Sequence, residues 1–418
     1  MREFENSGGH MIFGGMRADE IAKKYGTPVY VTDEDLLRAN YRSVHNAFSK
    51  YMDTRVHYAC KANSSLAILK ILEQEGSYID AVSVGEVITC MKAGFDASRI
   101  LYTGTSVSTH ELNEVAKLKV PINIDSASEL ERLAKIDTGM DISVRITPGV
   151  GSGHCDKVVT GAEGSKFGIP MDAAVETYGR ALDLGFKPKG IHAHIGSGGY
   201  TAEPFMESVS VLIEKTNEIK DELGLELQYI NMGGGFKVPY KPNEPEMDVE
   251  EIASAVTDMI LDETSVRTIA LEPGRYIVCD TTILLTRCND VKLTGIKNYI
   301  GVDAGFNTLI RPAFYGSYHH VAIANKFNKA CEGKYDVVGP ICESGDHIAR
   351  DRALPAPEEG DIIAVYNAGA YAFSMSSTYN SRPRCREVLV NNGKTELIRD
   401  NETMEDLLRH QVIPKRLL

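Results

Sequence analysis

The chain has 418 residues, more than one ordinary hydrophobic core needs, so its length predicts two domains. It is 43% hydrophobic and 25% charged, as soluble globular proteins are, and it has no apolar stretch of membrane-spanning length. The net charge of −13 argues against nucleic acid as a main partner, and we expect neither a nucleic-acid nor a membrane partner.

The N-terminus and the cysteines favour a cytoplasmic location. Residues 1–6 lack the basic segment followed by an apolar one that marks a secretory signal. The eight cysteines are scattered, without the short spacing of a zinc knuckle or a redox motif. We therefore expect reduced thiols in a cytoplasmic protein. Residues 1–16 resemble an extension without an assignable role.

Short apolar runs alternate with amphipathic segments from about residue 33 to 275. After a helix predicted over 34–49, the predicted strands are 55–60, 78–84, 99–104, 122–125, 141–146, 190–195, 229–233 and 268–272. A helical pattern lies between these strands; over 128–136, for example, Leu130, Leu133 and Ala134 recur with helical spacing. Strict alternation predicts an α/β fold, and eight regular units fit a (β/α)8 TIM-type barrel over 33–275 better than a doubly wound open sheet.

Helical periodicity nearly vanishes after Pro273 until 404–409. Short strands with turns between them are predicted at 276–285, 290–293, 299–302, 320–323, 335–338, 362–366 and 388–390. We therefore expect a mostly β C-terminal domain over 276–418. The N-terminal segment, residues 1–32, should join it through a strand near Pro28–Val31.

Polar and glycine residues collect at the carboxyl ends of the predicted barrel strands, the face on which barrel enzymes hold their active sites. These positions are Lys61, Ser83, Gly85, Gly104, Asp125, Ser126, Arg145, His194, Gly233–Gly235 and Glu272.

Lys61 follows the first predicted strand, within Tyr58–Asn63, and has small residues on both sides. Two interpretations are open. The aliphatic stem can pack while the ammonium reaches water, which is the favoured interpretation of a lone strand-end lysine. Alternatively, desolvation would depress the pKa of the amine and suit it to Schiff-base chemistry with a carbonyl cofactor.

Two further barrel motifs also allow more than one interpretation. Gly233–Gly235 follows the seventh strand, where it is either a flexible turn or a cradle of backbone amides for a phosphate. His192 and His194 point to the same strand face, but no acidic cluster with ligand spacing accompanies them. We therefore expect no metal, and a stacking or hydrogen-bonding role for His194.

Three clusters in the predicted β domain are ordinary loop sequences when each is considered alone. They are Arg311–Gly316, which has an arginine and a tyrosine four apart, Cys342–Asp346, which has a thiol and carboxylates, and Gly369–Ala372, which has a tyrosine among small residues.

Together these segments resemble the fold-type III pyridoxal-phosphate decarboxylases, and within them the diaminopimelate decarboxylases. The resemblance covers nearly the whole chain, in the expected order. Its segments are 25–31, 58–63, 165–168, 194–197, 233–235, 272–275, 311–316, 342–345 and 369–371. It implies an alanine-racemase-like barrel with a β domain, and the cofactor pyridoxal 5′-phosphate. The activity it implies is decarboxylation of meso-2,6-diaminopimelate to L-lysine, the last step of lysine biosynthesis.

The resemblance also assigns residue roles. Lys61 would bind the cofactor as a Schiff base, His194 would stack on its ring, and Glu272 would pair with the ring nitrogen. The resemblance assigns the phosphate and ring surroundings to Ser197, Gly233, Gly234, Gly235, Gly274, Arg275 and Tyr371. Substrate binding is assigned to Arg275, Arg311, Tyr315, Glu343 and Tyr371. Either Cys342 or Lys61 would supply the proton. In the family Cys342 and Glu343 come from a partner subunit, which implies a homodimer with shared active sites.

The sequence departs from the family at Val84, where a second glycine is usual, and the loop around His154–Asp156 has no interpretation. The close rival is a related decarboxylase acting on ornithine, arginine, lysine or carboxynorspermidine, which would not need Arg311 with Tyr315. Alanine-racemase-like chemistry would keep Lys61 but leave Cys342 and Glu343 unexplained. A one-domain pyridoxal-phosphate homeostasis protein would lack residues 276–418.

Overall fold

The computed structural model describes residues 2–149, 161–162, 164–196 and 199–418. The chain forms two compact units. The β unit comprises Met1–Leu37, Tyr240–Glu244 and Val278–Leu418, and the barrel unit comprises Arg38–Pro239 and Pro245–Ile277. These divisions lie a few residues beyond those predicted from the sequence. The segment Tyr240–Glu244 belongs to the β unit although the residues on both sides of it belong to the barrel unit.

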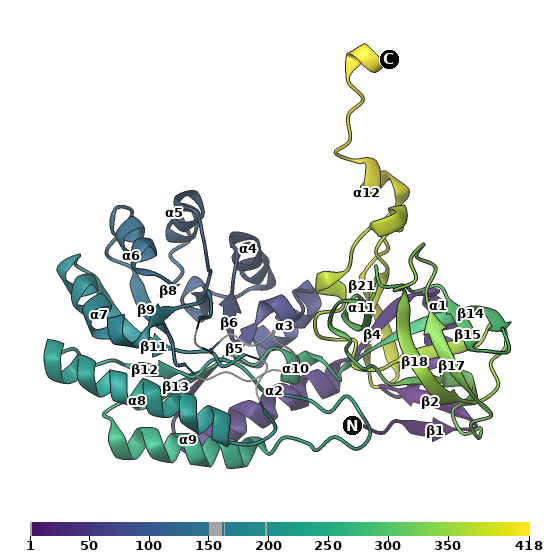
Figure 1. The fold of residues 1–418 in the computed structure, drawn as a ribbon, viewed down its shortest axis with the longest axis horizontal. Coiled ribbons are helices and arrows are strands. Elements are labelled where there is room, and N and C mark those ends of the chain that lie inside the picture. Colours follow the sequence, from purple (N-terminus) through teal and green to yellow (C-terminus); the bar gives the residue numbers. More distant parts are fainter. Residues whose placement is uncertain (1, 150–160, 163, 197–198) are drawn as a thin grey trace. The chain divides into compact units, whose positions relative to one another are not determined.

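Eight parallel strands close into a barrel in the barrel unit (Figure 1), which confirms the predicted fold class. They are β5 (Asp53–Ala59), β6 (Tyr78–Ala81), β7 (Ile100–Tyr102), β8 (Ile122–Ile124), β9 (Asp141–Thr147), β11 (Lys187–His192), β12 (Tyr229–Asn231) and β13 (Thr268–Leu271). Pairing of β13 with β5 and of β8 with β9 completes the circle. A short strand, β10 (Ile169–Pro170), adds to β9. Most residues of these strands are buried, because the barrel interior covers one face and the helices cover the other.

Helices surround the barrel strands (Figure 1); the first helix precedes β5, and each of the others lies between two barrel strands. They are α2 (Glu34–Ser49), α3 (Leu66–Gln74), α4 (Val84–Ala93), α5 (Thr109–Lys117), α6 (Ala127–Ala134), α7 (Ala174–Asp183), α8 (Glu203–Leu223) and α9 (Val249–Glu263). Helices α4, α5 and α6 each begin after a serine whose hydroxyl accepts the backbone N–H three residues later. Such caps fix the point at which each loop turns into its helix. They therefore also fix the strand ends that precede α4 and α6.

The β unit contains a large mixed sheet and a small antiparallel one. The small sheet consists of β1 (Glu5–Ser7), β2 (His10–Phe13) and β3 (Met16–Arg17), and α1 (Ala18–Tyr25) follows it. The large sheet consists of β4 (Val29–Asp33), β14 (Thr282–Leu293), β15 (Asn298–Val302), β16 (Val321–Ile323), β17 (Gly333–Val338), β18 (His347–Leu354), β19 (Ile362–Val365), β20 (Arg386–Asn391) and β21 (Lys394–Arg399). Because β4 pairs with both β14 and β20, the N-terminal segment is part of this sheet.

Both faces of the central strands in this sheet are buried. Along β4, Val29 and Val31 enter one hydrophobic core, whereas Tyr30 enters the other. Along β14, Ile283 and Leu284 divide in the same way. Alternation with a period of two residues is what an extended strand requires between two apolar layers. The β unit thus holds its loops on a sheet that is packed on both faces.

Several local predictions for this unit were wrong or incomplete; for example, the strands expected separately at 276–285 and 290–293 belong to one strand, β14. The strand expected over 276–285 begins only at Thr282, because helix α10 (Arg275–Val278) precedes it. The turn-rich segment at Arg311 forms a short helix, α11 (Arg311–Tyr315), which ends at Gly316 with a φ of 64°. Strands β18 and β21 were not predicted, because their sequences are rich in charged residues, as exposed edge strands commonly are.

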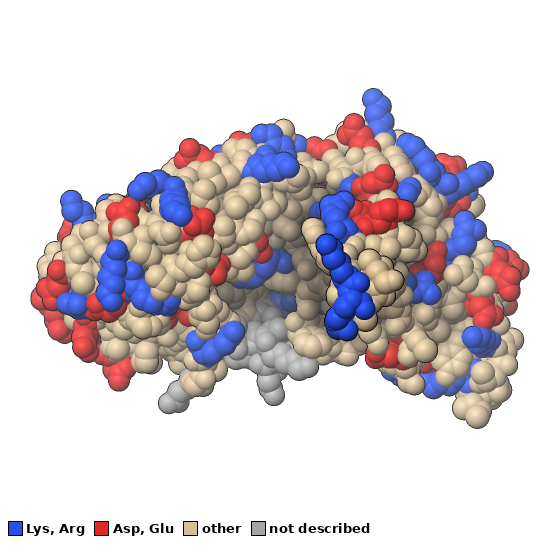
Figure 2. Space-filling view, turned by 90° about the horizontal axis from the view of Figure 1, so that it is seen from above, with Lys and Arg blue, Asp and Glu red and all other residues tan. Residues whose placement is uncertain are grey.

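The surface carries charges of both signs. Basic and acidic side chains are interspersed on the face shown in Figure 2. None of the helices in the described part of the chain has both the length and the apolar character needed to cross a bilayer. After β21 the chain extends away from the sheets of its unit through α12 (Met404–Leu408) (Figure 1). Large apolar side chains on this C-terminal segment, among them Met404, Leu408 and Val412, are exposed.

Candidate active site

Lys61 lies in a single 3-10 turn, Cys60–Ala62, that begins where β5 ends. Both of its neighbours in the turn are buried, and the lysine side chain itself is half-buried. Its Nζ lies 3.0 Å from Oδ2 of Asp80. The ammonium therefore has a carboxylate partner inside the barrel unit, in addition to any contact with solvent.

Asp80 is a functional candidate that the sequence analysis missed. It lies in β6, the strand that pairs with β5, and its side chain is fully buried. The hydroxyl of Thr103 donates a hydrogen bond to Oδ1, while Lys61 donates to Oδ2. Burial raises the pKa of Asp80 above its usual value, although the positive charge of Lys61 acts in the opposite direction. A charged residue inside the pattern of a buried strand was the signal that could have identified it.

Glu272 follows β13 and is 3% exposed, at the centre of a buried polar network. Its Oε2 lies 3.1 Å from Nε2 of His192, and its Oε1 accepts a hydrogen bond from Nδ2 of Asn231 at 2.8 Å. Nδ1 of His192 lies 3.1 Å from Nδ2 of Asn123, which can only donate, so Nε2 carries the proton that His192 offers to Glu272. Burial would raise the pKa of Glu272, but the interactions with His192, His194 and Lys61 together outweigh it and lower that pKa well below its usual value. Glu272 is thus held as a carboxylate.

His194 lies two residues after the end of β11, and its side chain is neutral. Its Nδ1 accepts a hydrogen bond from the backbone N–H of Gly196 at 3.0 Å. Burial lowers the pKa of His194 well below its usual value, and the nearby charges of Lys61 and Arg145 lower it further. A neutral imidazole whose ring is fixed by a hydrogen bond from a neighbouring backbone N–H is suited to stacking on an aromatic ring. Within the described residues, no group of three or more histidine, cysteine or acidic side chains is arranged to hold a metal ion.

The glycines after β12 allow close approach of backbone segments. A Cβ atom on Gly233 would lie 2.4 Å from the carbonyl oxygen of Ala193, and one on Gly234 would lie 2.5 Å from that of Glu272. Gly233 and Gly235 also have φ angles of 72° and 116°, which favour glycine. Only glycine therefore lets this loop lie against the ends of β11 and β13.

The segment Glu272–Arg275 packs in a similar way against the turn that carries Lys61. A Cβ atom on Gly274 would lie 3.0 Å from that of Ala59 and 3.2 Å from that of Ala62. Arg275 begins helix α10 and is half-buried. Lys61, His194, Glu272 and the glycine loop thus lie at the carboxyl ends of strands in one barrel.

Arg145 adds a buried positive charge at the same end of the barrel. It lies in β9, is 8% exposed, and its Cζ lies 4.6 Å from the centre of the Phe167 ring. Gly168, next in the chain, donates its backbone N–H to Oδ1 of Asp125 at 2.9 Å. The segment Ser165–Gly168, to which the sequence analysis gave no role, is therefore fixed beside two charged strand ends.

In the β unit, Arg311 is surrounded by tyrosine rings. Its Cζ lies 5.7 Å from the ring centres of Tyr240 and Tyr315, and 5.8 Å from that of Tyr371. The residue is 2% exposed, and its only hydrogen bond within the described residues runs from Nη2 to Oγ of Ser317, at 3.2 Å. It forms no ion pair with a carboxylate of the described residues, and its buried Nε has no acceptor there. We call Arg311 and these three tyrosines the arginine cage.

Cys342 and Glu343 lie on an exposed loop between β17 and β18. The backbone N–H of Cys342 donates to Oδ1 of Asn380 at 3.0 Å, and the hydroxyl of Tyr379 donates to Oε1 of Glu343 at 2.6 Å. Asp346 closes the loop by accepting the backbone N–H of Ile341 at 2.8 Å. The thiol and the carboxylate therefore face outward from a loop that is fixed at both ends.

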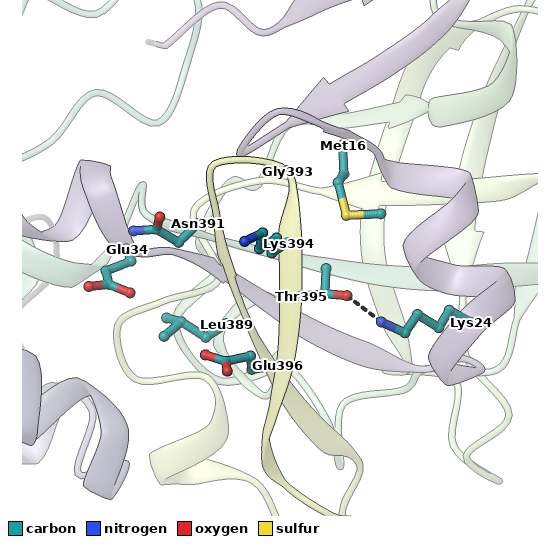
Figure 3. A pocket seen from close by; sticks show the side chains of 9 residues that line it. All are labelled: Met16, Lys24, Glu34, Leu389, Asn391, Gly393, Lys394, Thr395 and Glu396. Carbon is teal, nitrogen blue, oxygen red and sulfur yellow. Dashed lines mark hydrogen bonds between the residues drawn. The ribbon is translucent and has the colours of Figure 1, made fainter.

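The remaining predicted site residue is Ser197, which lies outside the described residues, as does the loop around His154–Asp156. A cavity of about 740 Å³ in the β unit is lined by none of the predicted site residues (Figure 3). Side chains of both charges line it, including Lys24, Glu34 and Glu396, and Nζ of Lys24 donates to Oγ1 of Thr395 at 2.8 Å. It therefore offers no surface of a single charge to a ligand.

Comparisons with known proteins agree with this geometry. The family model described as pyridoxal-dependent decarboxylase, pyridoxal binding domain, matches residues 34–279. The diaminopimelate decarboxylase of Methanothermobacter thermautotrophicus is 51% identical, over 99% of this chain and 98% of the relative. That of Archaeoglobus fulgidus is 43% identical, over 99% and 100%. The crystal structure of the enzyme from Methanocaldococcus jannaschii with L-lysine has a TM-score of 0.93 and 31% identity, and 99% of each chain is covered.

Proposed function

We propose that this chain, which belongs to the diaminopimelate decarboxylase family of pyridoxal-dependent decarboxylases, converts meso-2,6-diaminopimelate to L-lysine and carbon dioxide. Family membership supports the reaction type and the cofactor, pyridoxal 5′-phosphate. The choice among amino-acid substrates needs a further observation, because related decarboxylases share both.

The arginine cage is the observation that carries the substrate proposal. A guanidinium that is 2% exposed and lacks a carboxylate partner within the described residues is costly to bury unless a ligand completes it. Its planar N–H donors match a carboxylate by charge-assisted, bidentate hydrogen bonds. A substrate with two carboxylates can lose one and keep the other on Arg311. Ornithine, lysine and arginine have no second carboxylate to fill this role.

The barrel residues fit pyridoxal phosphate. The backbone N–H of Gly233 donates to Oδ1 of Asn231, and side chains on Gly233 or Gly234 would collide with neighbouring carbonyls. The glycine backbone that follows Gly233 can therefore approach a phosphate closely, as a phosphate cradle requires. When bound, the cofactor supplies a sink for the electron pair left behind by the departing carboxylate. Lys61 would hold it covalently, Ser197 would help bind its phosphate, and the neutral ring of His194 would stack on it. Glu272, kept ionised by His192 and Asn231, would hold a proton on the ring nitrogen.

The substrate would be oriented by arginine, tyrosine and glutamate side chains. Arg311, Arg275, Tyr315 and Tyr371 would bind the carboxylate that stays, and Glu343 would bind the distal ammonium. For the meso compound, this orientation presents the D-configured centre for loss of carbon dioxide and leaves an L-configured product. Cys342 or Lys61 would then deliver the proton that replaces the carboxylate.

We further propose a cytoplasmic homodimer in which Cys342 and Glu343 complete the active site of the partner subunit. Their exposed position on a fixed loop supports a role outside their own subunit. The exposed apolar side chains of the C-terminal segment offer a further surface for a second copy. The seven cysteines among the described residues are unpaired as disulfides, which suits a reducing compartment.

Carbon dioxide release from a substrate panel tests the proposal. Purified protein supplied with pyridoxal phosphate should release carbon dioxide from meso-2,6-diaminopimelate, with kcat/KM at least about a hundredfold above that for L-lysine, L-ornithine or L-arginine. Release from ornithine or lysine alone would contradict the substrate while leaving the family intact. The Lys61→Ala variant, assayed in parallel, controls for contaminating decarboxylases.

A further inference from the structure

Tyr240 is a member of the arginine cage to which the predicted site gave no role. It lies in the proline-containing loop between β12 and α9, on the segment that belongs to the β unit. Its ring centre lies 5.7 Å from Cζ of Arg311, a distance comparable to those of Tyr315 and Tyr371, at 5.7 and 5.8 Å. A loop from the middle of the barrel sequence thus supplies part of the surroundings of a β-unit residue.

The ring of Tyr240 is fixed from several directions. The carboxylate of Glu244 accepts the backbone N–H groups of Tyr240, at 2.7 Å, and of Lys241, at 3.1 Å, which closes the loop into a turn. The phenol oxygen lies 3.0 Å from Sγ of Cys279, a buried residue. The ring also makes an edge-to-face contact with His319, with centres 5.5 Å apart and planes at 88°. Tyr240 therefore presents its ring to Arg311 in a defined orientation.

A tyrosine cage stabilises a buried cation differently from a carboxylate. Aromatic rings within about 6 Å attract a guanidinium through their quadrupole and take up none of its N–H donors. An aspartate or glutamate partner would occupy the donors that a ligand carboxylate needs. Within the described residues, Arg311 makes one hydrogen bond, to Ser317, so most of its donors remain for a ligand.

We propose that Tyr240 is a specificity-determining positioning residue, which holds the guanidinium of Arg311 ready for the carboxylate that the substrate retains. This inference rests on the proposed function, because it assigns Arg311 to that carboxylate. Tyr240 acts through Arg311 and takes no part in the bond-breaking step. Loss of Tyr240 should therefore weaken the binding of those ligands whose carboxylate contacts Arg311, and should affect other ligands little.

Paired ligands with and without the carboxylate test this role. L-Lysine has the retained carboxylate, whereas 1,5-diaminopentane is the same molecule without it. In cofactor-loaded Tyr240→Leu, calorimetry should show L-lysine binding roughly tenfold weaker than in the wild type, and 1,5-diaminopentane binding changed by less than about twofold. The KM for meso-2,6-diaminopimelate should rise roughly tenfold, while kcat changes by less than about threefold.

Two variants serve as controls. Tyr240→Phe keeps the ring and removes only the contact of its hydroxyl with Cys279, so its ligand selectivity should stay near that of the wild type. Tyr318→Leu removes another arginine–tyrosine contact of the β unit, in which Cζ of Arg352 lies 3.8 Å from the ring centre, and should leave the selectivity unchanged. Equal weakening of both ligands in Tyr240→Leu, or the same selective loss in Tyr318→Leu, would overturn the inference. Absence of turnover of the diacid by the wild type would instead overturn the proposed function.

Discussion

The buried carboxylate of Asp80 lies 3.0 Å from Nζ of Lys61, at the ends of two neighbouring parallel strands. The hydroxyl of Thr103 donates to the other oxygen of Asp80, so the carboxylate is held on both sides. A desolvated acid with one fixed oxygen can hold an ammonium in a single position. The amine that we assign to cofactor attachment is thus oriented by a buried carboxylate.

Asp80→Asn should leave Lys61 in place but remove its counter-charge. We expect kcat for meso-2,6-diaminopimelate to fall about tenfold or more, because the position and protonation of the amine are no longer fixed. Steady-state kinetics would measure this. Thr103→Val, which removes only the supporting hydroxyl, should have a smaller effect, and an Asp80→Asn enzyme with wild-type kcat would count against the pairing.

Lys61→Ala should abolish covalent capture of the cofactor. Borohydride reduces the bond between a lysine and pyridoxal phosphate to a stable one, so mass spectrometry of the reduced wild type should locate the label on Lys61. The variant should carry none. Lys70→Ala is a suitable control, because Lys70 lies exposed on α3 and pairs with Glu73. Undiminished labelling of Lys61→Ala would place the attachment at another lysine.

Arg311→Ala should discriminate between substrates by their carboxylates. Loss of a buried charge-assisted contact is expected to raise the KM for meso-2,6-diaminopimelate roughly 30- to 100-fold. Any activity on a monocarboxylate should change far less. The matched control is Arg352→Ala, which removes another partly buried arginine of the β unit. Equal effects on both classes of substrate would contradict the assigned role of Arg311.

Glu129 should make the barrel unit less stable as the pH rises. Burial raises its pKa from 4.5 to about 7, and its buried Oε1 has no hydrogen-bond partner within the described residues. Between these two values the folded protein keeps a proton that the unfolded chain has lost, so the free energy of unfolding falls with rising pH, by up to roughly 3 kcal/mol. Well below pH 4.5 Glu129 is protonated in both the folded and the unfolded chain, so it no longer makes the free energy of unfolding depend on pH.

Glu129→Gln removes this titration. Its melting temperature relative to the wild type should therefore rise between pH 5 and pH 8, as measured by calorimetry. Glu111→Gln changes the corresponding first-turn glutamate of α5, which is half-buried and accepts a hydrogen bond from Tyr102 at 2.9 Å. This control shows whether replacing any first-turn glutamate changes the pH dependence of the melting temperature. A difference between Glu129→Gln and the wild type that stays constant with pH would contradict the assignment.

The barrel was predictable from the sequence because its strands are short apolar runs that recur between amphipathic helices. This alternation can be recognised in the local sequence without knowing which strands pair with one another. Strands β18 and β21 escaped prediction because exposed edge strands carry charges, and local sequence does not say which strands lie at an edge. The helix α10 escaped for a related reason, since four residues contain too little periodicity to distinguish a turn of helix from a strand.

The residues of the candidate site likewise fall into those that local sequence could predict and those that it could not. Lys61, Glu272 and Gly233–Gly235 could be proposed because they follow predicted strands and stand in motifs with a chemical meaning. Asp80 and Tyr240 could not, because their importance depends on contacts with residues distant in the sequence. Spatial partners of a motif are fixed by strand order and loop path, which local patterns do not contain.

The central claim is that this protein removes one carboxyl group from meso-2,6-diaminopimelate and keeps the other. The most direct test uses the diacid labelled with carbon-13 in both carboxyl groups, followed by nuclear magnetic resonance and chiral analysis of the product. We predict one equivalent of labelled carbon dioxide and one equivalent of L-lysine that retains its labelled carboxylate. Isomerised diacid without carbon dioxide, or lysine of the D configuration, would contradict the account.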